Sequence, residues 1–174
     1  MKTEQEAYEN LLCGHLEGFV WRLRKLPPEQ FDYQFAPAAP SARTLATHAY
    51  QWLVCDRYHI TEPDARKHAR VPDAPADPEG LVNALAEETE NWRQLLRGLS
   101  AADLDAPRSQ FNHESKWMTC TRDFVCHMIQ NTIYKHGQFA TIFFALGHDG
   151  TEPYTAPFPN PIYEELFGPR SDNA

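Results

Sequence analysis

Apolar side chains recur every three or four residues in four long stretches of the chain, and this spacing predicts four amphipathic helices. The predicted helices cover residues 3–26, 41–62, 77–99 and 121–146. The proline-rich connections that separate or follow them are residues 27–40, 63–78 and 151–161. Proline ends or interrupts helices, so these connections divide the chain clearly. Four amphipathic helices joined in this way predict an all-α fold, a four-helix bundle.

The expected helix ends carry residues that are typical of helix caps. Ser41 and Asp77 are good N-cap residues, and Pro78 suits the first position of a helix. Gly147 follows the last predicted helix, where glycine commonly ends helices. A short helical turn is expected over residues 100–103, whose spacing fits a capping box.

The last predicted helix is the most apolar of the four, and its apolar residues lie on two sides. Such a helix is usually central in a protein or lies at a contact between subunits. We expect the bundle to occupy residues 1–150. Residues 151–174 form a tail rich in proline and aromatic residues, which we expect to pack on the bundle.

Composition and charge exclude several classes of protein. The chain has 174 residues, which suits one domain, and a formal net charge of −8 at pH 7. It has no basic run, so a nucleic-acid partner or an anionic membrane surface is not expected. It also lacks an apolar stretch of about 20 residues that would span a membrane. The four cysteines follow no CxxC spacing, and we expect buried thiols and a cytoplasmic protein.

Polar residues on the core-facing sides of the helices are the candidates for chemistry, because burying an unpaired polar group is costly. His48 lies on the second predicted helix, and Glu88 lies on the third. His127, Asn131 and Lys135 follow one another at four-residue spacing on the last helix, so they form a ladder on one face. Histidine and carboxylate side chains from facing helices commonly form metal sites in bundles.

Some polar residues have a simpler structural interpretation. His15 and His59 are expected to be core histidines with hydrogen-bond partners. Glu88 can lean towards solvent or pair with Lys135. His136 is nine residues from His127 and therefore faces another side of the helix.

Two segments resemble the DinB/YfiT-like family. The run LPPEQFDYQFAPAAPSARTLATHAYQWL resembles its Leu-Pro turn, proline-rich link and helix with Leu-Ala-x-His. The run TRDFVCHMIQNTIYKHGQFATIFFALGHDG resembles its last core helix, with Gly-Gln and a terminal Leu-Gly. The resemblance implies an antiparallel four-helix bundle with a divalent metal, zinc or nickel, and frequent homodimers. It also implies thiol-dependent S-transferases and isomerases among the relatives.

The resemblance places three metal ligands, one histidine on the second helix and two residues four apart on the last. His48 matches the first position, but the other two hold Asn131 and Lys135. An amide oxygen is a weak ligand for zinc or nickel, and an ammonium group has no lone pair to donate. The family's metal site is therefore not expected to be intact in this chain.

Three hypotheses follow for this region. The first is a metal-free pocket in which Lys135 is a fixed cation for a small anionic or thiol ligand. The second is a shifted metal site of His48 and His127, with Glu88 or water, in a transferase or hydrolase. The third is a dimeric interaction module without catalysis. The predicted pocket residues are His48, Trp52, Glu88, His127, Asn131, Tyr134 and Lys135.

Overall fold

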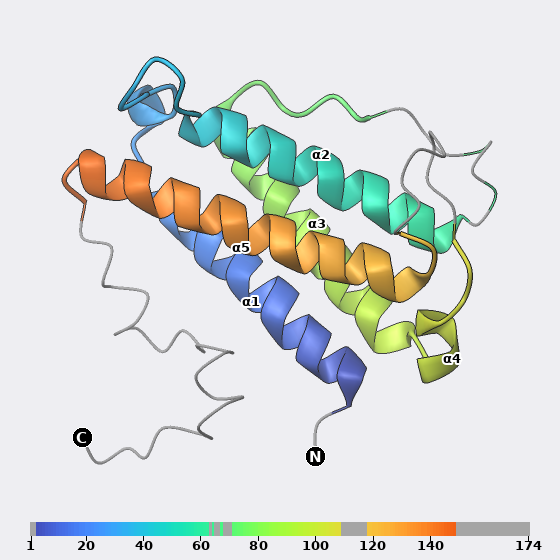
Figure 1. Cartoon of the computed structure of the whole chain (residues 1–174). Helices are drawn as coiled ribbons and strands as arrows, with labels where there is room; N and C mark the ends of the chain where they lie inside the picture. Colours follow the sequence, from blue (N-terminus) through green and yellow to red (C-terminus); the bar gives the residue numbers. More distant parts are fainter. Residues whose placement is uncertain (1–2, 63, 65–66, 68–70, 109–117, 149–174) are drawn as a thin grey trace, which may run out of the picture.

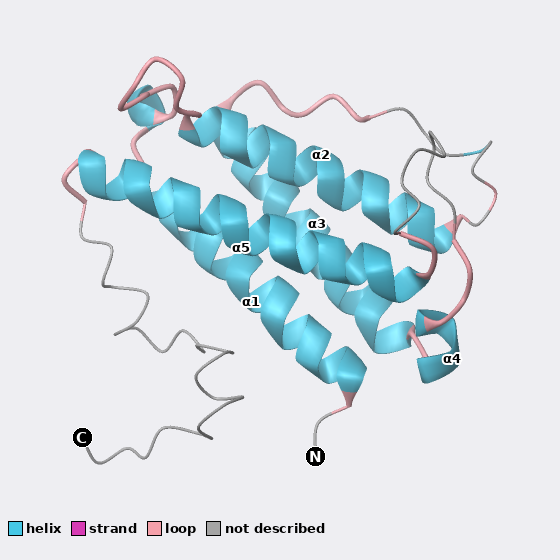
Figure 2. Cartoon of the chain, in the orientation of Figure 1, coloured by secondary structure: helices cyan, strands magenta, loops and turns pink. Residues whose placement is uncertain are grey.

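The structure, a computed structural model, describes residues 3–62, 64, 67, 71–108 and 118–148. Four long helices make up most of it. They are α1 (Glu4–Lys25), α2 (Ala42–Thr61), α3 (Pro78–Gly98) and α5 (Thr121–Ala145) (Figure 1). Two short elements accompany them, η1 (Pro28–Gln30) and α4 (Ala101–Leu104). The described residues contain no β-strand (Figure 2), so the predicted all-α bundle is confirmed. The predicted tail, residues 151–174, lies outside the described residues.

The predicted helix ends are confirmed because local caps fix them. The Ser41 side chain accepts a hydrogen bond from a backbone N–H in the first turn of α2. The Asp77 side chain does the same for α3, with 2.6 Å between its Oδ1 and the amide nitrogen of Gly80. Ser100 forms the expected capping box at α4. Gly147 has a φ of 81°, the left-handed conformation in which glycine ends a helix without strain.

The long connection between α2 and α3 sets the directions of the helices. Its described part runs back along α2, where Gln51 donates to the carbonyl of Pro72 and Arg43 to that of Ala76. Consequently α2 and α3 run in the same direction, whereas α2 and α5 run in opposite directions (Figure 1). The four long helices form a closed ring, in which α1 packs on α3, α3 on α2, α2 on α5 and α5 on α1.

The core is a single apolar cluster between the four helices. Trp92 is fully buried in it, and its indole N–H donates to the carbonyl of Leu53 over 3.0 Å. The largest other side chains that are fully buried include Phe19, Phe31, Phe124 and Phe139. None of the described helices has the length and apolar content that a membrane span requires.

Two expectations from the apolar pattern were wrong. Of the cysteines, Cys13 is buried, but Cys126 is exposed because it faces outward on α5. The Tyr134 side chain, placed with the pocket, is 64% exposed. Since α5 packs on α1 and α2 on two flanks, no other long helix of the described residues covers its third side, and both residues lie there.

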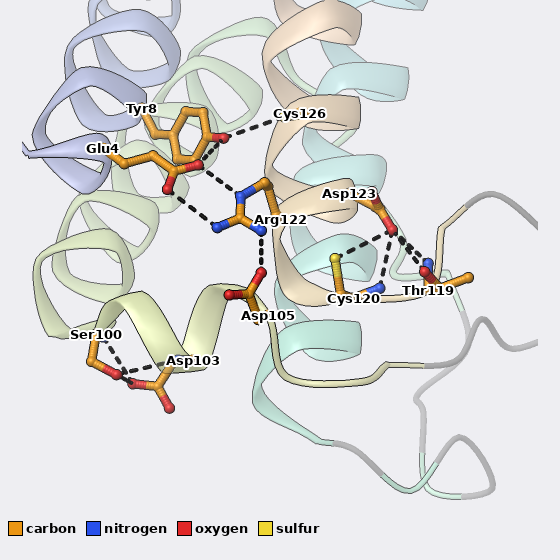
Figure 3. A network of polar contacts seen from close by, with 10 residues as sticks. All are labelled: Glu4, Tyr8, Ser100, Asp103, Asp105, Thr119, Cys120, Arg122, Asp123 and Cys126. Atoms are coloured by element: carbon orange, nitrogen blue, oxygen red, sulfur yellow. Dashed lines mark hydrogen bonds and ion pairs between the residues drawn. The ribbon is translucent and has the colours of Figure 1, made fainter.

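Polar contacts hold the start of α5 against α1 and the segment after α4 (Figure 3). The Arg122 guanidinium pairs with Glu4, with 2.7 Å between Nε and Oε1, and also with Asp105. Asp123 accepts hydrogen bonds from the backbone N–H groups of the two residues that precede the helix. These contacts fix the first turn of α5 and thereby the position of His127, one turn later.

Candidate functional site

Polar residues at four-residue spacing face each other across α2 and α5. The two helices run in opposite directions (Figure 1), and Asp56, in the second half of α2, meets His127, near the start of α5. We call this region the α2–α5 seam. It consists of His48, Trp52, Asp56, His127, Asn131 and Lys135.

Asp56 and His127 form a close pair at one end of the seam. The distance between Asp56 Oδ2 and His127 Nδ1 is 2.5 Å, and the Asp56 side chain is fully buried. The other carboxylate oxygen lies 3.4 Å from Nδ1 of His59, which is also buried. An ionised carboxylate only accepts hydrogen bonds, so His127 carries its proton on Nδ1. No hydrogen bond joins the other ring nitrogen, His127 Nε2, to a described residue.

His48 and Trp52 form a second pair, closer to the other end. The indole N–H of Trp52 donates to His48 Nε2 over 2.7 Å. Indole is a donor only, so His48 Nε2 is unprotonated and its Nδ1 carries the hydrogen. The Trp52 ring also packs edge-on against His127, with 5.5 Å between ring centroids. His48 was expected to face the core, but it is exposed at the mouth of the seam.

Lys135 is the buried cation of the seam. Its side chain is 6% exposed, and no hydrogen bond or ion pair joins it to another described residue. Burial lowers the pKa of its ammonium group. Partial burial and the positive charges of Lys135 and His127 lower the pKa of His48. The Oδ1 atom of Asn131, one helical turn before Lys135 on α5, is buried and has no partner among the described residues.

Glu88 does not belong to this site. Arg57, on α2, reaches it across the α2–α3 contact with two hydrogen bonds, 2.5 Å to Oε1 and 3.1 Å to Oε2. The Glu88 carboxylate also accepts a hydrogen bond from Asn91. The sequence-based pairing with Lys135 was therefore wrong, because a guanidinium on the neighbouring helix already satisfies both carboxylate oxygens.

Tyr134 lies outside the seam, along a groove of about 740 Å³ on the outer face of α5. We call it the outer groove; its apolar lining includes Tyr8, Leu11, Ile129, Ile133 and Tyr134. His127 borders this groove as well as the seam, so its ring is reached from the groove.

Two other histidines occupy the opposite flank of α5. His15 and His136 lie between α1 and α5, with 3.4 Å between their Nδ1 atoms. His136 Nε2 lies 2.5 Å from the Arg22 guanidinium. Burial and the positive charges of Arg22 and His15 lower the pKa of His136 to about 3. The prediction that His136 faces away from His127 is confirmed.

The residues of the seam do not fit a divalent metal. Two of the positions implied by the family resemblance hold Asn131 and Lys135, and neither is a suitable ligand for zinc or nickel. The lone pair of His48 Nε2 is occupied by the Trp52 indole. Nowhere in the described part of the chain do three histidine, cysteine, aspartate or glutamate side chains converge to hold a metal.

Asp56 is the residue of the seam that the sequence analysis missed. It follows His48 and Trp52 at the same four-residue spacing that revealed the ladder on the last helix. Applying the four-residue test to polar residues on both helices would have found it.

Comparisons with known proteins agree with this architecture. The family model of the DinB superfamily matches residues 14–139. A structure assigned to the DinB family from Exiguobacterium sibiricum 255-15 is similar, with a TM-score of 0.64 and 18% identity over 86% of this chain and 95% of that one. No curated protein matches the chain.

Two further solved structures share the fold. YfiT from Bacillus subtilis, described as a probable metal-dependent hydrolase with an unusual four-helix bundle topology, has a TM-score of 0.63 and 12% identity over 86% of this chain and 91% of its own. A conserved protein from Enterococcus faecalis has a TM-score of 0.60 and 19% identity, covering 84% and 99% of the two chains. With the family model matched over most of the bundle, the chain belongs to the DinB superfamily.

Proposed function

We propose that the α2–α5 seam binds a small anionic ligand, with Lys135 as the cation that holds it. The observation that carries this proposal is the buried side chain of Lys135, whose ammonium group has no counter-ion among the described residues. A buried charge without a partner is costly, and an anionic ligand would supply that partner. The family resemblance also implies a metal ligand at the position of Lys135. In this chain the lysine ammonium would supply positive charge in place of the metal ion.

The neighbouring side chains support an anion in the same place. His48 presents its Nδ1–H as a second hydrogen-bond donor, because its other nitrogen already accepts from Trp52. The only carboxylate of the seam, Asp56, lies at its far end and is engaged with His127. An anion beside Lys135 therefore meets donors and no competing negative charge from the seam itself.

The test is a thermal-shift titration with formate, acetate and phosphate against chloride at constant ionic strength. We expect at least one of these anions to raise the melting temperature of the wild-type protein by mass action. Lys135→Met is expected to remove this response. Lys25→Met is the matched control, because Lys25 is exposed near the end of α1 and lies over Trp21.

Two outcomes would contradict the proposal. If Lys135→Met kept the full response, the anion would bind elsewhere. If none of the anions shifted the melting temperature, the fixed-cation hypothesis would fail, and a dimeric interaction module would become the better interpretation. The exposed side chains of Ile133, Tyr134 and Phe144 on α5 are the surface that would favour such a module.

A second candidate is a metal-dependent transferase or hydrolase with a shifted site, and the description of YfiT as a probable metal-dependent hydrolase favours it. It would require His48 to leave Trp52 so that its Nε2 lone pair becomes available. Elemental analysis after dialysis against zinc and nickel separates the two candidates. We expect well below one metal per chain; about one metal, lost in His48→Ala, would favour the shifted site.

A further inference from the structure

The outer groove on α5 is lined by a histidine that a buried carboxylate holds in place. His127 lines the groove, and its side chain is 26% exposed. Its Nδ1 lies 2.5 Å from Oδ2 of Asp56, whose side chain is fully buried. No hydrogen bond joins Nε2 to a described residue. The side-chain atoms that are both buried and unpartnered in the described part of the chain do not include Nε2, so this atom is accessible from the surface.

The contact with Asp56 determines what Nε2 can do. Because the Nδ1 hydrogen is directed to the Asp56 carboxylate, the neutral ring keeps a lone pair on Nε2 and accepts hydrogen bonds there. A carboxylate that accepts from one ring nitrogen polarises the ring and strengthens the other nitrogen as an acceptor. A molecule in the groove is therefore expected to present a hydrogen-bond donor to His127.

The rest of the groove selects a molecule that is apolar and uncharged. The rings of Tyr8 and Tyr134 stand among aliphatic side chains in it, and its described lining includes no lysine or arginine. The carboxylate of this lining, Asp123, already accepts from backbone N–H groups before α5 (Figure 3). An anion would thus meet a carboxylate and no cation. The volume of about 740 Å³ is within the range of small-molecule sites.

We propose that the outer groove binds a neutral phenol, whose hydroxyl donates to His127 Nε2 and whose ring packs among the apolar side chains. An aromatic ring suits a groove with two tyrosine rings, because aromatic pairs gain from edge-on and offset contacts. The phenolic hydroxyl supplies the donor that the polarised histidine requires. This site goes beyond the proposed anion site, since its ligand is uncharged and Lys135 does not line the groove.

Three ligands with the same ring test the proposal in ligand-observed NMR titrations of the full-length protein. We use p-cresol, its methyl ether p-methylanisole, which has no hydroxyl to donate, and the anion p-toluate. We expect p-cresol to bind about fivefold more tightly than p-methylanisole, the usual scale for one neutral hydrogen bond. Equal affinities of p-cresol and p-methylanisole, or no binding of either, would overturn the proposal.

A variant of His127 shows whether this residue accepts the hydroxyl. His127→Asn places an amide N–H close to the position of Nδ1, so it can still donate to Asp56, but it has no atom in the place of Nε2. We expect it to bind p-methylanisole as the wild type does and to lose the preference for p-cresol. If a folded His127→Asn protein kept that preference, the assignment of His127 would be wrong.

A variant of Tyr134 locates the ligand even if His127→Asn folds poorly. The Tyr134 side chain is 64% exposed, so Tyr134→Ala is expected to fold normally. It should weaken p-cresol and p-methylanisole alike by about fivefold, as expected for the loss of about 40 Å² of apolar contact. Tyr58→Ala is the matched control, because Tyr58 is also exposed but lies on α2 outside the groove. Equal affinities in the two tyrosine variants would place the ligand elsewhere and overturn the proposal.

Two further results would contradict the proposal in different ways. If p-toluate bound more tightly than p-cresol and Tyr134→Ala weakened it, the groove would prefer an anion. If sedimentation showed a dimer that Tyr134→Ala dissociates, and p-cresol did not bind, a second copy of the chain would be the occupant of the groove.

Discussion

The two flanks of α5 carry similar residues but differ in how they are closed. On the α1 side, Arg22 and His136 are in contact and Phe19 and Phe139 pack beside them, with 5.2 Å between the two aromatic rings. On the α2 side, Lys135 is buried beside Asn131, while His48 lies exposed at the mouth. Both flanks bury a cation next to histidine. The two flanks differ in that the cation of the α1 flank contacts a histidine ring directly, whereas His48 of the α2 flank is exposed to solvent.

The largest expected effect comes from breaking the pair that closes one end of the α2–α5 seam. Asp56→Ala would remove the buried partner of both His127 and His59. Losing one member of such a pair typically costs about 3–5 kcal/mol. We expect the free energy of unfolding, measured with urea, to fall by this amount. Asp56→Asn keeps the shape and a carbonyl acceptor, so a cost as large as that of Asp56→Ala would show that charge matters more than hydrogen bonding.

The α1 flank is expected to make the protein sensitive to acid. His136 has a pKa near 3 in the folded chain, against about 6.5 when unfolded. The unfolded chain therefore binds a proton that the folded chain does not, and stability is lost as the pH falls from about 6.5 towards 3. The loss is on the order of 1 kcal/mol per pH unit.

Unfolding free energies between pH 7 and pH 4 measure this dependence. His136→Gln removes the titrating group and should flatten the profile. His148→Gln is the control, because His148 lies near the end of the bundle beside Phe143 and contacts Gln30. An unchanged slope in His136→Gln would show that other groups cause the acid loss.

The smallest expected effect is at the lysine of the seam in the absence of ligand. Lys135→Met replaces a buried ammonium by an apolar side chain of similar length, so we expect the free energy of unfolding to rise by about 1 kcal/mol. Thermal and urea unfolding in chloride buffer measure the change, with Lys25→Met as the exposed control. A decrease instead would mean that Lys135 has a stabilising partner in the ligand-free protein.

Part of the candidate site was visible in the sequence and part was not. The ladder of His127, Asn131 and Lys135 depends on spacing alone, and the structure places these residues along one flank of α5. The ion pair between Arg57 and Glu88 was missed, because spacing on one helix says nothing about which side chain of another helix lies within reach. Tyr134 was misplaced for a related reason, since the apolar pattern of α5 does not tell which of its sides stays uncovered.

The sequence by itself determined where the helices begin and end, because caps and proline act through neighbours in the chain. It also determined which residues share a helix face, because that depends only on the helical repeat. Only the tertiary structure decided that Asp56 meets His127 and that the lone pair of His48 is taken by Trp52. These contacts depend on the opposite directions of α2 and α5 and on their relative rotation. Packing of the whole bundle sets both quantities, and no local segment encodes them.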